Sequence, residues 1–460
     1  MKHEIFENES VTKALIKLAL PTVIGQIILV IYNMADTFFI GQTGNDAMLT
    51  AVTICMPAFM FLSAISNLFG IGGASVIARA IGTGDESRAS SASALAFWGC
   101  LFTAAVYSIT VLIFRDLFVD ALGGTDRSVH SNAVEYVTVT VTIGGISTAI
   151  ASMLSHLIRA EGRAMQASLG IAVGGVANIA LDPLFMFVIL PPGHEAMGAA
   201  IATALSNLIS LIFFVVVLFC IRKHSHINLK PTAEMTQKGI PIDILSAGIP
   251  ACVMTLFENI SFAVLDKLIS FAGVPMQAGI GVAKKLNMLA HSIVRGIAQG
   301  ALPLIGYHFA SKNYKRMCQS FQAASVMSVS MATACMTVCL IFAKPFVNAF
   351  IHTESESMRY GVVFLRILCL GGPFSALAYT VISFFQAVGS GKKSFILAIL
   401  RKGIVDIPLM IVLNTVAPIY GVVSATPVAD IVCCTVSIFL LRRYLISIKM
   451  SRRFETEDVK

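Results

Sequence analysis

The amino-acid sequence predicts an all-α integral membrane protein with about twelve transmembrane helices in two six-helix lobes. Its 460 residues are 56% hydrophobic and only 13% charged, more apolar than a soluble chain of this length can bury. The apolar stretches run for about 20 residues, the length of a helix that crosses a bilayer, without the alternation of a membrane barrel. The second half of the chain weakly repeats the first, so we expect lobes related by a pseudo-two-fold axis along the membrane normal.

Apolar windows separated by glycine, proline or charged residues give the positions of these helices in order. The first apolar run follows a charged N-terminus and is too long for a cleaved signal peptide, so we expect it to remain as a transmembrane helix. The expected spans are residues 14–40, 48–78, 92–114, 134–157, 166–190, 197–221, 246–271, 281–306, 320–343, 361–385, 395–417 and 419–445.

The lysine and arginine residues predict the orientation in the membrane. Most of the 33 lie at the N-terminus, in every second loop and in the C-terminal tail, and loops rich in these residues stay in the cytoplasm. We therefore expect a multi-pass protein of the plasma (cell inner) membrane with both termini cytoplasmic. Because the basic residues mark the ends of spans rather than one patch, the net charge of +8 does not indicate nucleic-acid binding. The basic segments are residues 1–17, 79–88, 159–163, 222–238, 312–316, 392–402 and 442–460.

The lobe boundaries follow from the longest polar loop and from three pairs of similar segments. The similar pairs are residues 20–21 and 249–250, 158–162 and 385–389, and 197–203 and 420–426. The expected parts are an N-terminal lobe at 1–221 (helices 1–6), a cytoplasmic inter-lobe loop at 222–245, a C-terminal lobe at 246–445 (helices 7–12) and a cytoplasmic tail at 446–460. Lobes arranged in this way place a transport cavity between or within them.

The fifth span carries an amide, a carboxylate and a proline at membrane depth. Asn178 and Asp182 are four residues apart, so a helix presents both on one side. Pro183 has no N–H, so the carbonyl about one turn earlier loses its partner and the helix is expected to bend there as a hinge. A carboxylate in hydrocarbon is costly unless it is protonated, paired or bound to an ion, which makes this group a candidate functional site. The alternative is a polar residue that only joins helices.

Two other spans place polar residues at the same level. Asp36 lies in the first span, with Tyr32 and Asn33 about one turn earlier on the same face. At 1.5 Å per residue, Asp36 lies about 30 Å along its helix, Asp182 about 24 Å along the fifth span and Thr203 about 9 Å from the outer end of the sixth. We therefore predict that these residues and the amide of the fifth span form one cation or proton site. Their oxygen atoms suit either Na⁺ or a protonation switch, so the coupling ion stays open.

The C-terminal lobe has its own acidic residues within the spans. Glu258 lies near the middle of the seventh span and is either a counter-charge for a cationic substrate, a second proton carrier, or the partner of Arg295 or Arg366 in a structural ion pair. Asp406 and Asp430 lie deeper in the same lobe and could equally pair with arginines there.

Motifs of other protein classes are missing. Residues 389–394 superficially resemble a phosphate-binding loop but lack its glycine frame, and Gly391-Lys392 is not followed by Ser or Thr. The nine histidines show no zinc spacing, the ten cysteines show no disulfide framework, and no nucleophile–base pair stands out. The sequence therefore predicts neither ATP-driven transport, nor a resident cofactor, nor an enzyme.

Several motifs together resemble the multidrug and toxic compound extrusion (MATE) transporters, most closely their bacterial multidrug branch. The matching residues are Asp36, Asn178, Asp182 and Pro183, with the segments 77–85 and 303–306. The resemblance covers about 14–444 and implies export of cationic amphipathic drugs and dyes, driven by inward flow of H⁺ or Na⁺. It assigns the coupling site to Asp36, Asn178, Asp182 and Thr203, with Tyr32 beside it, and matches Glu258 to an acidic position of the seventh helix. Some members carry a further acidic residue in the tenth span, where residues 364–373 of this chain have none.

These observations predict a secondary active multidrug efflux antiporter that works by alternating access. The candidate substrate-binding residues are Tyr32, Asn33 and Glu258, and Pro183 is the candidate hinge. The expected partners are small cationic drugs or dyes and membrane lipid, with no nucleic acid, and the expected state is a monomer. The alternatives are a lipid-linked oligosaccharide flippase of the same broad superfamily and a polytopic membrane enzyme. Membrane-depth charges that are mostly acidic argue against the flippase, whose cavities tend to be cationic.

Overall fold

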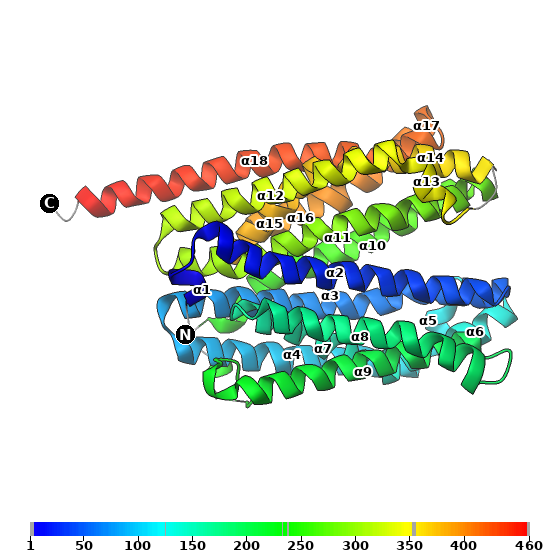
Figure 1. Ribbon diagram of the computed structural model, residues 1–460, viewed down its shortest axis with the longest axis horizontal. Helices are drawn as coiled ribbons and strands as arrows, with labels where there is room; N and C mark the ends of the chain where they lie inside the picture. Colours follow the sequence, from blue (N-terminus) through cyan, green and yellow to red (C-terminus); the bar gives the residue numbers. More distant parts are fainter. Residues whose placement is uncertain (1–3, 125, 232, 237–238, 352–355, 458–460) are drawn as a thin grey trace.

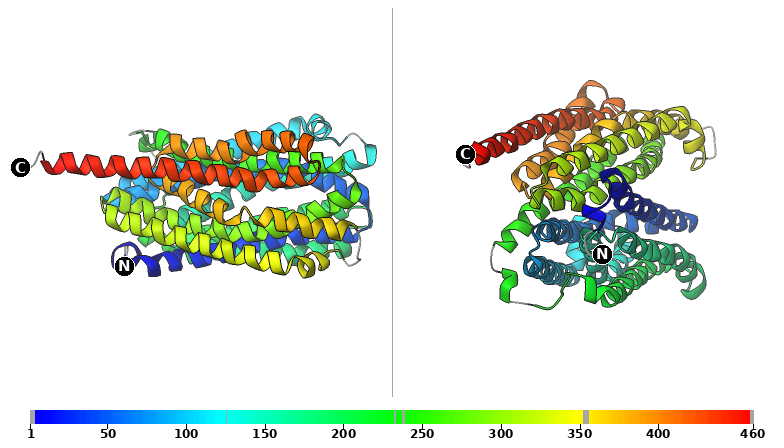
Figure 2. Two further views of the ribbon diagram at one scale, coloured as in Figure 1. Left: turned by 90° about the horizontal axis from the view of Figure 1, so that it is seen from above. Right: turned by 60° about the vertical axis from the view of Figure 1, so that its left-hand side comes forward.

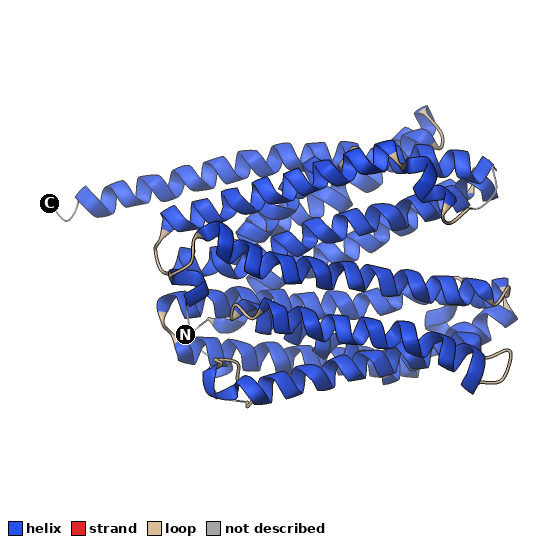
Figure 3. Cartoon of the chain, in the orientation of Figure 1, coloured by secondary structure: helices blue, strands red, loops and turns tan. Residues whose placement is uncertain are grey.

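A computed structural model describes residues 4–124, 126–231, 233–236, 239–351 and 356–457. Within these ranges the chain is helical apart from short loops and turns (Figure 3). The long helices run side by side along one axis, and both ends of the chain lie at the same end of the bundle, which we call the terminal end (Figure 1). Lys238 and Lys460, which belong to the basic segments that predict the orientation, lie outside the described residues.

Nine helices of the described residues are long and apolar enough to cross a membrane. They are α2 (Val11–Gln42), α3 (Asp46–Thr83), α4 (Glu86–Ile113), α8 (Ala164–Leu184) continued by the π-helical turn η2 (Phe185–Ile189), α9 (Glu195–Ile221), α10 (Ile240–Ser270), α11 (Val274–Ala310), α12 (Tyr314–Ile341) and α18 (Tyr420–Glu457).

Two further spans are bent pairs of helices. One joins α6 (Arg127–Val137) and the π-helical η1 (Thr138–Ile143) to α7 (Gly145–Ala160) with a bend of 48°. The other joins α14 (Glu356–Cys369) to α15 (Gly372–Ala387) with a bend of 45°.

The eleventh predicted span is helical but strongly charged. It consists of α16 (Gly391–Ile399), the π-helical η5 (Leu400–Asp406) and α17 (Ile407–Val416). The nine helices, the two bent pairs and this stretch coincide one for one with the twelve spans that the sequence predicts. The predicted fold class is therefore confirmed. Short helices lie in the connections: α1 (Glu4–Glu7), α5 (Arg115–Ala121), α13 (Ala343–Asn348), η3 (Arg222–His224) and η4 (Ala233–Thr236).

Side-chain caps fix where several spans begin. Asn45 accepts hydrogen bonds from the backbone at the start of α3, Asp85 does so for α4, Asp126 for α6 and Asn313 for α12. An Asn or Asp side chain at this position satisfies backbone N–H groups that have no partner within the helix. Gly84 ends α3 with a φ of 74°, a conformation that suits glycine.

The two lobes share one hydrophobic core at the terminal end and have separate cores at the opposite end. The shared core joins the starts of α2 and α10 with the ends of α3, α11 and α15. At the other end, one core belongs to the N-terminal lobe and a second to the C-terminal lobe. Figures 1 and 2 show the first lobe in blue to green and the second in yellow-green to red. The bundle is thus closed at the terminal end, and its lobes pack as separate units at the other.

Small residues allow the lobes to approach closely at the terminal end. A Cβ atom on Gly72 of α3 would lie within 3.0 Å of the Ile244 side chain of α10, and one on Gly300 of α11 would lie 2.6 Å from Ala19 of α2. Glycine at such crossings lets helix backbones pack directly in a membrane. Asn67 also donates a 2.9 Å hydrogen bond across the interface to Thr255.

The connection between the lobes lies against the N-terminal lobe. The Trp98 indole donates a 3.0 Å hydrogen bond to the Leu229 carbonyl, and Ser93 and Asn228 bond each other through side chain and backbone. Directly after the end of α7, the Glu161 carboxylate accepts a 2.8 Å hydrogen bond from the Ser225 hydroxyl. These contacts fix the loop after α9 on the lobe from which it emerges.

Candidate functional site

The polar residues of the fifth and sixth predicted spans meet inside the N-terminal lobe. The Asn178 side-chain amide of α8 donates to the Asp182 carboxylate over 3.3 Å and to the Thr203 hydroxyl of α9 over 3.4 Å. Exposed fractions are 1% for Asn178, 0% for Asp182 and 3% for Thr203. A buried carboxylate is therefore held in place by an amide that is itself fixed by a second helix.

Asp36 of α2 completes this group from a third helix. It lies close enough to Asp182, and to the amide and hydroxyl that share the site, to interact with them electrostatically. One carboxylate oxygen of Asp36, one of Asp182 and the amide oxygen of Asn178 are buried without a hydrogen-bond donor. The structure thus brings together all four residues that the sequence predicts as the cation or proton site. We call Asp36, Asn178, Asp182 and Thr203 the N-lobe carboxylate site.

Glycines bring the three helices of this site close together. A Cβ atom on Gly174 of α8 would lie 3.0 Å from Ser210 of α9, and one on Gly175 would lie 2.8 Å from Ile28 of α2. A Cβ atom on Gly198 of α9 would lie 2.9 Å from the backbone of Phe185. Because α2 and α9 both approach α8 at small residues, their polar side chains reach the α8 carboxylate.

Two tyrosines lie beside the carboxylates, and only one of them was expected. Tyr32 is 8% exposed and Tyr136 of α6 is 6% exposed, and both lie close enough to interact electrostatically with Asp36 and Asp182. Tyr136 belongs to an apolar window, and no acidic residue at helical spacing marks it in the sequence. Asn33, a predicted substrate-binding residue, donates instead to the Leu29 carbonyl of its own helix, over 2.6 Å.

Pro183 lies inside α8, directly after Asp182. The helix continues past it and becomes π-helical at Phe185–Ile189, so residues 164–189 remain one span. Prolines remove one hydrogen bond of a helix, and π-helical turns are frequent at functional sites. The loosened backbone therefore lies next to the carboxylate site, where the sequence places the hinge.

The N-lobe carboxylate site has no positive partner among the residues that the structure describes. The ion pairs among the described residues include neither Asp36 nor Asp182. Two adjacent carboxylates in a medium of low dielectric repel each other strongly, and a cation bound between them removes that repulsion. The chemistry that this geometry supports is reversible binding of a small cation.

In the C-terminal lobe, Glu258 of α10 is already paired. Arg295 of α11 donates to one of its carboxylate oxygens over 2.9 Å, and the Tyr379 hydroxyl of α15 donates to the other over 3.1 Å. Arg366, the other partner considered, is exposed and donates to the Leu340 carbonyl. Of the two ion pairs that the sequence left open, the structure forms the one with Arg295.

Two further ion pairs lie deeper in the C-terminal lobe. Arg401 donates to Asp430 over 2.8 Å and lies above the Tyr379 ring at 4.2 Å. Lys402 donates to Asp406 over 2.8 Å, and Ser261 donates to the same carboxylate over 2.7 Å. Sequence reasoning did not foresee the pair with Lys402, although its spacing of four residues is the signal for it. Each acidic side chain of this group thus has a basic partner, in contrast to the N-lobe carboxylate site.

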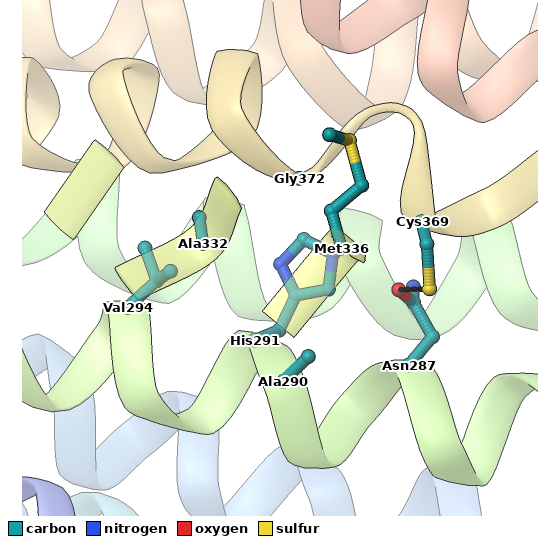
Figure 4. Close-up of a pocket in the computed structure, with 8 residues that line it drawn as sticks. All are labelled: Asn287, Ala290, His291, Val294, Ala332, Met336, Cys369 and Gly372. Carbon is teal, nitrogen blue, oxygen red and sulfur yellow. Dashed lines mark hydrogen bonds between the residues drawn. The ribbon is translucent and has the colours of Figure 1, made fainter. Parts of the chain in front are cut away.

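A pocket lies beside this charged group, at the break between α14 and α15. Its cavity volume is about 10 Å³. Figure 4 shows His291 and Asn287 of α11 beside it, with Asn287 next to Cys369. His291 is hydrogen-bonded to the Ser375 hydroxyl over 3.2 Å, and Arg401 donates to that same hydroxyl. The pocket is therefore connected to the C-lobe ion pairs through one serine.

Comparisons with known proteins agree with the fold. The model of the family MatE matches residues 21–184 and 250–412, one segment in each lobe. A multidrug export protein MepA of Staphylococcus haemolyticus is 28% identical over 440 residues, which are 95% of this chain and 94% of that protein. MepA of Staphylococcus aureus strain MRSA252 is 27% identical over 448 residues, with 95% of each chain covered.

Solved structures show the same fold at lower sequence identity. A crystal structure of a MATE in complex with MaL6 has a TM-score of 0.90 at 24% identity and covers 98% of this chain and 99% of that one. An outward-facing multidrug resistance transporter of the MATE family has a TM-score of 0.87 at 23% identity, with the same coverage.

A twelve-span bundle with two repeated lobes and a buried carboxylate site defines a helical membrane transporter rather than an enzyme. The match to both lobes is decisive for the family: the chain belongs to the MatE family. The resemblance seen in the sequence is thereby confirmed.

Proposed function

We propose that this protein exports cationic amphipathic compounds, drugs and dyes among them, across the plasma membrane in exchange for an inward-moving H⁺ or Na⁺. The observation that carries this proposal is the N-lobe carboxylate site, in which Asp36 and Asp182 lie together without a basic partner. Such a site costs free energy unless a cation occupies it, so it is retained for binding one. The names of the MepA relatives, multidrug export proteins, support the same activity.

The state of the bundle agrees with export. We infer from the basic segments that the termini lie in the cytoplasm, and the lobes share a core at the terminal end. With that orientation, the two lobes pack together on the cytoplasmic side and have separate cores on the outer side. This is the state in which an exporter releases its substrate and binds the driving ion. We further propose that one chain forms the working unit, because both lobes of the transporter are present in it.

Coupling follows from where the ion binds. A cation that enters from the outside neutralises Asp36 and Asp182, and the site then no longer attracts a cationic substrate in the same lobe. Bending of α8 near Pro183 changes the shape of this lobe as the charge changes. Substrate and ion can drive each other in this way only if each binds the two states with different affinity.

The site suits either ion, and its geometry favours the proton. Carboxylate, amide and hydroxyl oxygens are all ligands for a hard cation such as Na⁺. Asp36 and Asp182, however, lie close enough to interact with each other electrostatically, and adjacent carboxyl groups can share one proton. Glu258 is bound by Arg295, so we propose that it serves structure and not substrate charge, with Tyr32 beside the substrate path.

The test is efflux of ethidium from proteoliposomes under a pure pH gradient and, separately, under a pure Na⁺ gradient. We expect the pH gradient to drive efflux, and Asp36→Asn and Asp182→Asn each to abolish it. Asp116→Asn is the matched control, because that side chain lies in α5 of the same lobe and is 67% exposed. Efflux that depends on the Na⁺ gradient alone would assign the site to Na⁺. Normal efflux by either site variant under both gradients would contradict the proposal.

A further inference from the structure

Arg159 is a buried arginine without an acidic partner. It lies in the last turn of α7, near the terminal end of the bundle, and is 2% exposed. Its one hydrogen-bond contact is with Nδ1 of His156, over 3.2 Å. Its Nε and Nη2 atoms are buried and have no acceptor among the described residues.

Arg159 lines a pocket between the two lobes. The pocket is lined by Arg159 and His156 of α7, by residues of α3, and by Gln299 of α11. Its cavity volume is about 10 Å³, which is about the room that one water-sized group needs. Because α7 belongs to the first lobe and α11 to the second, a ligand in this pocket would contact both.

The polar groups around the pocket are hydrogen-bond donors. Arg159 always donates, so the His156 Nδ1 that it contacts is the acceptor, and Nε2 of that ring carries the proton. The carbonyl oxygen of Gln299 accepts from Gln26 over 3.3 Å, which leaves the NH₂ group of Gln299 available to donate. A guanidinium, an imidazole N–H and a carboxamide NH₂ thus line one pocket, and two of the guanidinium nitrogens have no acceptor among the described residues.

The nearest acid in the sequence is occupied elsewhere. Glu161, two residues after Arg159, accepts hydrogen bonds from Ser225 and from the His226 backbone, and lies 3.6 Å from Arg163. The ion pairs among the described residues do not include Arg159. An unpaired buried charge is costly, and in a native protein such a group usually has an ion or a water as partner.

We propose that this pocket binds a small monovalent anion, a halide or a carboxylate, held by Arg159, His156 and Gln299. The anion compensates the buried guanidinium and accepts hydrogen bonds from both lobes. It therefore stabilises the state in which the lobes are closed at the terminal end, since separation of the lobes there would remove Gln299 from the site. A ligand that binds one state preferentially shifts the equilibrium toward it.

The test uses the purified full-length protein in detergent and measures its thermal unfolding at constant ionic strength. Sodium gluconate is replaced stepwise by chloride in one series and by acetate in another. We expect a saturable rise of the unfolding temperature with at least one of the small anions, and the series that produces it distinguishes halide from carboxylate. Arg159→Gln should remove the rise. Arg163→Gln, which changes a nearby arginine that donates to the His224 carbonyl, should retain it.

A second measurement keeps the proposal testable if Arg159→Gln does not fold. Crystals of the unaltered protein grown in bromide should show anomalous scattering beside the Arg159 guanidinium. If the rise is the same in the Arg159 and Arg163 variants, the anion acts elsewhere and the proposal is wrong. An ordered water in place of bromide, together with no response to acetate, would also overturn it. Neither outcome depends on which ion drives export.

Discussion

Arg295 and Glu258 join α11 to α10 by a hydrogen-bonded ion pair of 2.9 Å, and Tyr379 donates a second bond to the same carboxylate. The Glu258 side chain is 15% exposed and that of Arg295 is 37% exposed. The pair is therefore more shielded from water than a surface ion pair and less shielded than a fully buried one. It ties together two helices of the C-terminal lobe that both contact the N-terminal lobe.

We expect Glu258→Gln to lower the free energy of unfolding by about 2 kcal/mol, between the values for surface and buried pairs, because Arg295 loses its charged partner. Thermal unfolding in detergent measures this loss, and the double variant Glu258→Gln, Arg295→Gln should recover part of it. Asp266→Asn is the control, because its pair with Lys284 joins the same two helices and its carboxylate is 44% exposed. An unchanged stability of Glu258→Gln, with weaker binding of cationic drugs, would instead assign Glu258 to the substrate.

Pro183→Ala should make α8 more stable and transport slower. The alanine N–H restores a hydrogen bond inside the helix, and the gain can reach about 3 kcal/mol. Thermal unfolding and ethidium efflux are measured on the same preparation. Pro57→Ala is the control, because Pro57 also lies inside a helix of the N-terminal lobe, α3. If both variants transport at the normal rate, bending at Pro183 is not part of the transport cycle.

Gly248→Val should disfavour closure of the lobes at the terminal end. A Cβ atom at Gly248 of α10 would overlap the Leu68 carbonyl of α3, so the two lobes must move apart to accept it. Distances between spin labels on α3 and α10 should increase in this variant. Gly281→Val of α11 serves as the control, since nothing lies within 4 Å of a Cβ atom there. Equal label distances in the two variants would show that this glycine does not control closure.

Arg316→Gln should release the N-terminal segment from the C-terminal lobe. The Arg316 guanidinium of α12 donates to the Glu7 and Glu9 carbonyls over 2.6 and 2.5 Å. Loss of one hydrogen bond from a charged donor, about 1.5 kcal/mol, corresponds to about tenfold faster local opening. Hydrogen exchange at residues 5–9 measures this, with Lys315→Gln as the control at an exposed neighbour. Exchange as slow as in the unaltered protein would show that other contacts hold the segment, such as the stacking of Phe6 on Tyr307.

The spans and the N-lobe carboxylate site could be predicted from the sequence because apolar length, residue spacing and helical rise are properties of single segments. A helix of known rise converts residue number into depth, so Asp36, Asp182 and Thr203 fall at one level before any contact is known. The four-residue spacing from Asn178 to Asp182 places both on one face. In the structure, the Asn178 amide donates to Asp182 and Thr203, and Asp36 lies close to this group. Asn33 differs because its side chain donates to the Leu29 carbonyl of its own helix. Residue spacing does not reveal whether a side chain bonds to its own backbone or to a site.

The sequence by itself determined the twelve spans, the repeat of the lobes and the level of the carboxylates, because hydrophobic length and helical rise act along a single chain. Only the tertiary structure decided which charges are compensated. Glu258 meets Arg295, whereas Asp36, Asp182 and Arg159 meet no opposite charge among the described residues. The reason is that pairing depends on how each helix is rotated about its axis and on which small residues let neighbours approach. Packing of the whole bundle fixes both of these.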